Sequence, residues 1–158
     1  MSEEVGSPIA GFRMKMYRSP IAATDTWTAI GAVESVSLDN ISRETIEVAY
    51  RGCEWKRNIP GMMEAMEATM KLIHNVNPEM ETVIREDMLN ATPAKYAFLN
   101  GDITTSGTEG WVIPAYVVQM NRSEELSEVV ANDIKLTLGH VLNSTGTGLI
   151  DPEWYVTE

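Results

Sequence analysis

The sequence predicts a mainly β protein, an antiparallel β-sandwich or barrel with one flanking α-helix. About six stretches alternate apolar and polar residues, which is the periodicity of half-buried strands, whereas one stretch carries clear helix signals. The strand stretches lie on both sides of the helix without a regular strand–helix–strand alternation, so antiparallel pairing is favoured. With 158 residues and 44% apolar composition, the chain is long enough to bury one core.

The strand stretches are defined by alternation and by β-branched residues. Residues 26–38 and 44–51 alternate and are rich in Val, Ile and Thr, and residues 130–138 place Ile134 and Leu136 opposite charged neighbours. Residues 111–120 are apolar on both faces, which is typical of a buried strand. The Asn-Gly pair at 100–101 predicts a hairpin before this strand, and Pro114 predicts an edge or a bulge within it.

The helix is predicted at residues 77–92. Asn77 is a capping residue, Pro78 suits the first helical position, and acidic residues follow in the first turn. Pro93 then ends the helix.

Residues 58–75, NIPGMMEAMEATMKLIHN, allow two interpretations. Met, Glu and Ala favour a helix, but the segment begins with Pro60-Gly61 and alternates afterwards, as a half-buried strand does. Its position between a strand and the helix at Asn77 favours the strand. In a strand, Met62, Met66 and Met70 face the core.

The domain organisation follows from where this patterning is strong. Residues 1–25 are predicted to form an N-terminal arm, residues 26–142 one β-sandwich domain, and residues 143–158 a C-terminal arm. Within the domain, residues 40–60 form a long polar excursion that contains the one basic cluster of the chain. Long ordered connections of this kind usually carry function.

Composition excludes several classes of function. The chain has 12 basic and 23 acidic residues, a net charge of −11, and such a surface repels nucleic-acid phosphates and anionic lipids. No secretory signal or membrane-spanning stretch is expected. Cys53 is the only cysteine, so no internal disulfide or thiolate metal cluster can form. His74 and His140 do not have metal-binding spacing. We therefore expect no catalytic residue, no metal and no cofactor.

Five motifs in order carry a resemblance. They are SVSLDNISRETIEVAYRG, WKRNIPG, the helix with VIREDML, GWVIPAYVVQM, and VVANDIKLTLG, over roughly residues 26–139. In this arrangement the chain resembles the major tail tube proteins of long-tailed, siphovirus-type bacteriophages. One departure is the methionine-rich MMEAMEATM, where tube proteins more often show small, polar and aromatic residues.

The resemblance implies a structural virion protein. Six copies would close a ring, and rings would stack into the hollow tail tube that conducts DNA from capsid to host cell without specific binding. The implied partners are further copies of the chain, a tape-measure protein, and tail terminator and tail-tip proteins, with no membrane. Assembly would take place in the bacterial host cytoplasm.

Two sets of residues are candidates for this role. The excursion at 40–60 would contact the next ring, because arginine and aromatic residues dominate interface energetics. Its candidates are Arg43, Arg51, Trp55, Lys56 and Arg57. The candidates for lining the lumen are the polar residues of two strands, Glu67, Thr69, Lys71, Asp133 and Lys135. The alternative is a small-ligand-binding β-barrel whose methionine-rich strand lines an apolar pocket.

Overall fold

The structure is a computed structural model that describes residues 14–22, 26–31, 33–52, 54–74, 76–123 and 130–158. These residues form ten strands and one helix, which confirms the predicted mainly β class with a single helix. In chain order the elements are β1 (Lys15–Pro20), β2 (Thr28–Ile30), β3 (Val33–Asp39), β4 (Arg43–Val48), β5 (Arg57–Met63), β6 (Glu67–Ile73), α1 (Pro78–Leu89), β7 (Ala94–Leu99), β8 (Glu109–Ser123), β9 (Ala131–Leu138) and β10 (Glu153–Val156).

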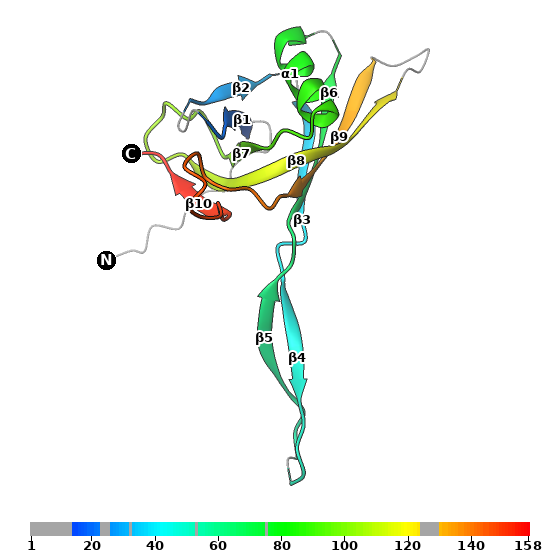
Figure 1. The fold of residues 1–158 in the computed structure, drawn as a ribbon, viewed down its shortest axis with the longest axis vertical. Coiled ribbons are helices and arrows are strands. Elements are labelled where there is room, and N and C mark those ends of the chain that lie inside the picture. Colours follow the sequence, from blue (N-terminus) through cyan, green and yellow to red (C-terminus); the bar gives the residue numbers. More distant parts are fainter. Residues whose placement is uncertain (1–13, 23–25, 32, 53, 75, 124–129) are drawn as a thin grey trace, which may run out of the picture.

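Eight strands form one antiparallel sheet, and β4 and β5 form a separate hairpin that projects far from it (Figure 1). The order along the sheet is β2-β1-β7-β8-β9-β6-β3, and β10 pairs with β8 beside this path. The long strand β8 joins the two halves, because its first part pairs with β7 and its second part with β9. One sheet can therefore curl around a core and form both layers.

The main core lies between the two halves of the sheet. Tyr96 and Ile113 come from one half, Met70 and Leu136 come from the other, and all four are buried. A smaller cluster covers the opposite side of the first half and centres on Tyr17, Ala97, Leu99 and Val112. The outer side of the second half, β9-β6-β3, belongs to neither cluster and stays open.

The helix begins as predicted but ends at Leu89, three residues before the predicted end, and it is fixed to the sheet near both ends. The Asn77 side chain accepts the Met80 amide at 3.4 Å, and Pro78 occupies the first turn. Near the start, the buried Glu81 carboxylate lies 2.6 Å from His74 Nδ1 and accepts Asn132 Nδ2 at 2.9 Å. These bonds tie α1 to the end of β6 and to β9.

The second attachment of the helix is a buried ion pair. Arg18 of β1 donates through Nε and Nη2 to the two carboxylate oxygens of Asp87, at 2.8 and 2.9 Å. The Tyr96 hydroxyl donates to the same carboxylate at 3.3 Å. Burial and the neighbouring Asp87 charge raise the pKa of Tyr96, so its hydroxyl remains a donor.

The methionine-rich segment is extended, as predicted, but it forms two strands in different sheets. Pro60 and Gly61 lie inside β5, which ends at Met63. Residues 64–66 connect it to β6, which starts at Glu67 in the other sheet. Met66 and Met70 are buried as expected. The prediction for Met62 is wrong, because its side chain is 78% exposed on the projecting hairpin.

Other elements differ from the prediction because they depend on long-range pairing. Residues 26–38 form two strands, β2 and β3, which lie at opposite edges of the sheet. Lys15–Pro20, assigned by sequence to an arm, forms β1 between β2 and β7, whereas residues 1–13 lie outside the described residues. Near the C-terminus, Glu153–Val156 pairs with β8 of the same chain. The expected turn at Asn100-Gly101 is a longer loop, residues 100–108.

Pro114 lies within β8 at a position where no neighbouring strand requires a backbone amide donor. Its carbonyl accepts the Gly139 amide at 3.1 Å, so its nitrogen faces the same side of the strand. On that side β10 begins with Glu153 opposite Val112, and β9 ends with Leu138 opposite Ala115, so neither strand pairs with Pro114 itself. The predicted irregularity is therefore a gap between two neighbouring strands, and the bulge itself occurs further on, between Val117 and Gln119.

Gly110 allows β8 to approach β7 closely. A Cβ atom at this position would collide with the carbonyl group of Phe98 in the neighbouring strand. We expect Gly110→Ala to lower the free energy of unfolding by about 1–3 kcal/mol, measured by urea denaturation. Gly148→Ala is the matched control, since its Cβ would meet nothing closer than 3.8 Å. Equal stability of the two variants would contradict the close approach.

Candidate assembly surfaces

Four neighbouring strands, β3, β6, β9 and the second part of β8, present an outer face made almost entirely of polar side chains. On β6 the even-numbered residues from Ala68 to Leu72 are buried, and the odd-numbered residues lie on the other side. Pairing continues this alternation across the neighbouring strands. The same pairings place Tyr116 and Ile73 at the two ends of this face. Its polar residues, which we call the polar face, are Ser35, Ser37, Asp39, Glu67, Thr69, Lys71, Gln119, Asn121, Asp133, Lys135 and Thr137.

The five predicted lumen residues all lie on this polar face. Thr69 is directly opposite Lys135, and Lys71 is directly opposite Asp133 in the β6–β9 pairing. Glu67 joins them through an ion pair with Lys135, whose Nζ lies 3.5 Å from the Glu67 carboxylate. The sequence therefore predicted which side chains share a face, while β3 and β8, which extend it, were missed.

The polar face carries a surplus of negative charge. Its two lysines are both in ion pairs, Lys135 with Glu67 and Lys71 with Glu34 at 3.6 Å. Such partly exposed pairs contribute little to stability, about 0–1 kcal/mol each. Asp39 and Asp133 add carboxylates without adding lysines, so the face as a whole repels a polyanion.

The hairpin is the second surface. β4 and β5 pair from Arg43 opposite Met63 to Val48 opposite Arg57. Among the described elements, they make extended contact only with each other. The predicted excursion at 40–60 is thus an ordered two-stranded ribbon that leaves the body of the protein (Figure 1).

The two faces of this hairpin differ in chemistry. Ile46 and Ile59 are cross-strand partners on one face, and they are 53% and 52% exposed. The other face carries Thr45, Glu47 and Asn58. A two-stranded hairpin is marginally stable by itself in water, and this one also leaves its apolar face uncovered. The physical expectation is a partner on the apolar face.

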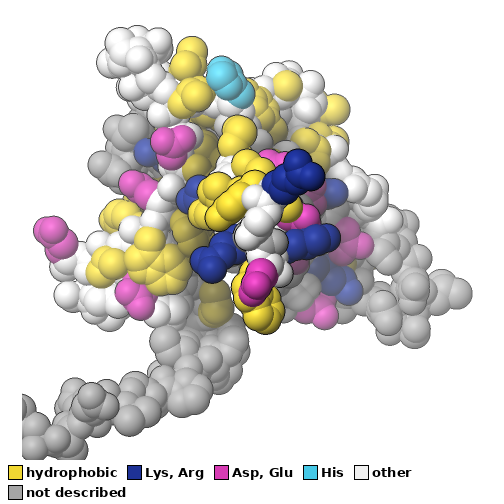
Figure 2. Space-filling model, turned by 90° about the horizontal axis from the view of Figure 1, so that it is seen from below, with side chains coloured by type: hydrophobic (Ala, Val, Ile, Leu, Met, Phe, Trp, Pro, Cys, Tyr) yellow, Lys and Arg dark blue, Asp and Glu magenta, His cyan; other side chains and the backbone are white. Residues whose placement is uncertain are grey.

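All five predicted inter-ring residues lie on the hairpin. Arg43 is at its base, where Nη1 donates to the Gly61 carbonyl at 2.9 Å, and Arg57 begins β5. Arg51, Trp55 and Lys56 lie in the tip between the strands, and Lys56 pairs with Glu47 at 3.6 Å. Viewed toward the tip, basic and hydrophobic side chains gather together (Figure 2). Sequence reasoning missed the exposed face of Ile46 and Ile59, although the alternation around Ile46 in ETIEV was visible.

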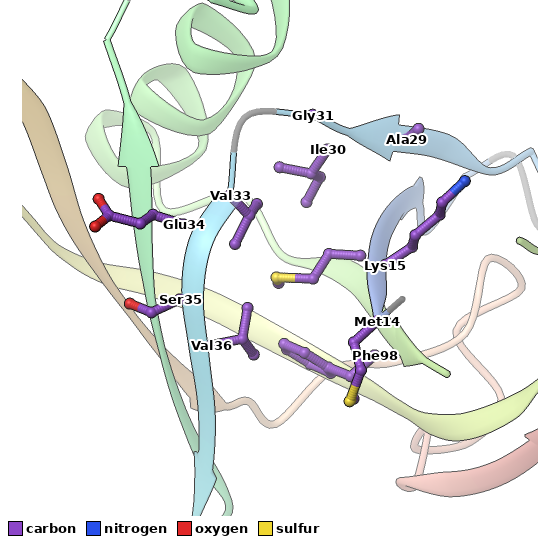
Figure 3. Close-up of a pocket in the computed structure, with 11 residues that line it drawn as sticks. Met14, Lys15, Ala29, Ile30, Gly31, Val33, Glu34, Ser35, Val36 and Phe98 are labelled. Atoms are coloured by element: carbon purple, nitrogen blue, oxygen red, sulfur yellow. The ribbon is translucent and has the colours of Figure 1, made fainter. Parts of the chain in front are cut away.

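A groove of about 730 Å³ lies between β2 and β3, the two edges of the curled sheet. Side chains of Ile30, Val33, Val36 and Phe98 point into it, whereas Glu34 points away (Figure 3). This groove was not predicted, because the alternation of residues 26–38 indicated one continuous strand in place of β2 and β3. No residue of β6 lines the groove, and Met70 of that strand is packed in the core. The groove is therefore not the pocket lined by the methionine-rich strand that the small-ligand alternative expects.

The described residues contain no group of three His, Cys, Asp or Glu side chains arranged to hold a metal ion. Among the same residues, no helix has the length and apolar character needed to cross a membrane.

Comparisons with solved structures identify the fold. The chain superposes on a protein of the SPP1 tail tube with a TM-score of 0.68 and 16% identity, covering 94% of this chain and 80% of that one. It matches the tail of a gene transfer agent particle with a TM-score of 0.67 and 8% identity, over 84% and 95% of the two chains. The chain has the fold of the tail tube proteins. A chain of the PVC sheath–tube complex, an extracellular contractile injection system, shares this fold with a TM-score of 0.61, 16% identity, and coverage of 96% and 94%.

These tail tube neighbours are structural proteins and not enzymes. No family model and no curated protein sequence matches the chain. At identities of 8–16% the tail tube fold is retained with very different side chains. The role of each surface must therefore be argued from this chain's own residues.

Proposed function

We propose that the protein is a structural component of a virion tail, in which six copies form a ring and rings stack into a hollow tube. The observation that carries the proposal is the projecting hairpin, an ordered ribbon whose apolar face has no partner within the described chain. The tail tube fold supports it, and the similar gene transfer agent tail has C6 symmetry.

Ring closure would satisfy the sheet edges. Within the described residues, β2 and β3 each pair on one side only, which leaves backbone donors and acceptors of β3 open over seven residues. Exposed edges of this length tend to pair with other chains. Pairing between neighbouring copies would remove the edges in a closed ring.

We place the polar face toward the lumen. Duplex DNA carries one negative charge per about 1.7 Å of its axis, so it binds tightly to surfaces with surplus lysine and arginine. The polar face has the opposite balance, with both lysines already paired to carboxylates. A lumen of this kind conducts DNA from capsid to host cell without holding it.

The remaining partners are those that the resemblance to tail tube proteins implies. A tube of stacked rings has two ends and an interior, which a tail terminator, tail-tip proteins and a tape-measure protein would occupy. Similar structures include a sheath/tube terminator of the PVC system and a tube-terminating cap of the anti-feeding prophage. Assembly would take place in the cytoplasm of a bacterial host.

Negative-stain electron microscopy of the purified protein tests this function. We expect rings and tubes with sixfold end views at high protein concentration. Particles that remain monomeric at every concentration, including after addition of tail-tip proteins, would contradict the proposal and favour a small-ligand-binding protein.

The lumen assignment makes a separate prediction. Thr69→Lys with Asp133→Lys adds three positive charges to the polar face and breaks neither of its two ion pairs. Tubes of this variant, assembled with labelled duplex DNA and treated with nuclease, should retain protected DNA at low salt and release it as salt rises. Tubes of the parent protein should protect none.

The matched control places the same three charges on the helix. Thr82→Lys with Glu86→Lys changes two exposed positions of α1, away from the polar face. These tubes should bind DNA, if at all, only where nuclease can reach it. Protection by the helix variant equal to that by the polar-face variant would refute the lumen assignment.

A further inference from the structure

The groove between β2 and β3 has an apolar floor. Phe98 forms the floor and is 2% exposed, while Val36 and Met14 are open to solvent at the sides. Lys15 and Glu34 border the groove, but Glu34 points away from it (Figure 3) and each is paired elsewhere, Lys15 with Asp102 at 3.4 Å and Glu34 with Lys71 at 3.6 Å. Its volume falls within the range of about 300–1,000 Å³ over which proteins enclose apolar groups.

The apolar face of the hairpin is complementary to this groove. Ile46, Val48 and Ile59 provide its centre. Glu44 and Arg57 share the same face: a Cβ on Gly61 would contact both Glu44 and Ile46, and Arg57 lies two residues from Ile59. The face therefore offers aliphatic side chains, which suit the apolar floor of the groove.

The overall charges of the two parts also favour contact between copies. Residues 40–63 contain four basic and three acidic side chains, whereas the rest of the chain contains eight basic and twenty acidic ones. The hairpin is thus attracted to the body of a second copy, while two bodies repel each other. This arrangement steers association toward hairpin-to-body contact.

We propose that the apolar face of the β4–β5 hairpin in one copy docks in the β2–β3 groove of a second copy. The inference rests on the proposed tube and names the receptor for its hairpin. The hairpin extends away from the groove of its own chain, so the contact joins two molecules (Figure 1). Because donor and receptor are different surfaces, each copy can donate to one neighbour and receive from another, which builds an open-ended stack.

Disulfide cross-linking in the assembled full-length protein tests this contact. In a Cys53→Ser background, Ile59→Cys on the hairpin is combined with Val36→Cys in the groove. Oxidation should give a ladder of dimers, trimers and larger species on a non-reducing gel. Each single-cysteine variant can give dimers at most, so the ladder is specific to a contact between different surfaces.

Two control pairs define the faces involved. Asn58→Cys with Val36→Cys moves the hairpin cysteine to the polar face. Ile59→Cys with Val118→Cys moves the receptor to a valine of β8 outside the groove, which is 52% exposed against 37% for Val36. Both controls should give at least about tenfold less ladder. A control ladder as strong as that of the test pair would overturn the proposal.

Electron microscopy of the same samples distinguishes failure of the groove contact from failure of tube formation. Tubes that form but give no ladder from the Ile59–Val36 pair would refute the groove as receptor while the tube function stands. Absence of both tubes and ladder in the folded parent and its variants would refute the tube itself.

A single substitution provides an independent test without cysteines. Val36→Asp places a carboxylate in the groove and should raise the protein concentration needed for tube formation by at least about tenfold. Val76→Asp, at an exposed valine in the turn before α1, should leave that concentration unchanged. Circular dichroism confirms that both variants are folded. Unchanged assembly of a folded Val36→Asp variant would contradict the proposal.

Discussion

Removal of the hairpin is expected to abolish tube formation while leaving a folded monomer. Arg43 and Met63 are paired at its base, so residues 44–62 can be replaced by Asn-Gly, which closes a two-residue turn. Because β4 and β5 contact no other element extensively, the free energy of unfolding should stay within about 0.5 kcal/mol of the parent. Electron microscopy and urea denaturation measure the two effects.

Point substitutions separate the apolar face of the hairpin from its length. Ile46→Asp with Ile59→Asp should prevent assembly as completely as the deletion, since each isoleucine loses about 1.5–3 kcal/mol of burial on docking. Thr45→Ala with Asn58→Ala changes the polar face and should assemble normally. Normal tubes from the hairpin deletion would show that ring stacking uses another surface.

The largest effect on stability is expected at the Arg18–Asp87 pair. Both side chains are nearly buried, at 11% and 7% exposure, and they are joined by two hydrogen bonds. Asp87→Ala leaves the guanidinium buried without its carboxylate and removes the acceptor of the Tyr96 hydroxyl. We expect a loss of about 3–5 kcal/mol in the free energy of unfolding, measured by urea denaturation.

Two further variants show whether this loss comes from the unpaired charge. Arg18→Met with Asp87→Leu replaces both charges by apolar groups and should be clearly more stable than Asp87→Ala alone. Glu86→Ala, at an exposed neighbouring position of α1, should change stability by about 0.5 kcal/mol or less. A loss below about 1 kcal/mol for Asp87→Ala would mean that the pair does not fix the helix.

Local pattern predicted the elements whose signals lie within a few residues. The cap at Asn77 and the proline at 78 correctly place the start of α1, whereas the helix ends at Leu89, before Pro93. Strict alternation correctly assigned the buried side of β9 and, through the same period, placed Glu67, Thr69 and Lys71 together. These predictions succeed because side-chain direction in a strand depends only on position along it.

Residue periodicity failed to predict burial where the same local pattern lies in two different tertiary environments. Met62 and Met66 occur in one run and have the same parity, yet the first is on the hairpin and the second is in the core. The break at residues 64–66 separates two sheets, and no residue in it is a strong turn former. Likewise, β1 is held in place by backbone bonds to β2 and β7, which composition alone does not reveal.

The sequence by itself determined the mainly β class, the single helix, the acidic character and the part of the polar face that lies on β6 and β9. Each of these depends on composition or on periodicity within one segment. Only the tertiary structure decided that the excursion is a projecting hairpin with an apolar face, and that the edges β2 and β3 border a groove. These surfaces are formed by residues far apart in the chain, so their existence depends on strand pairing, which no single segment specifies.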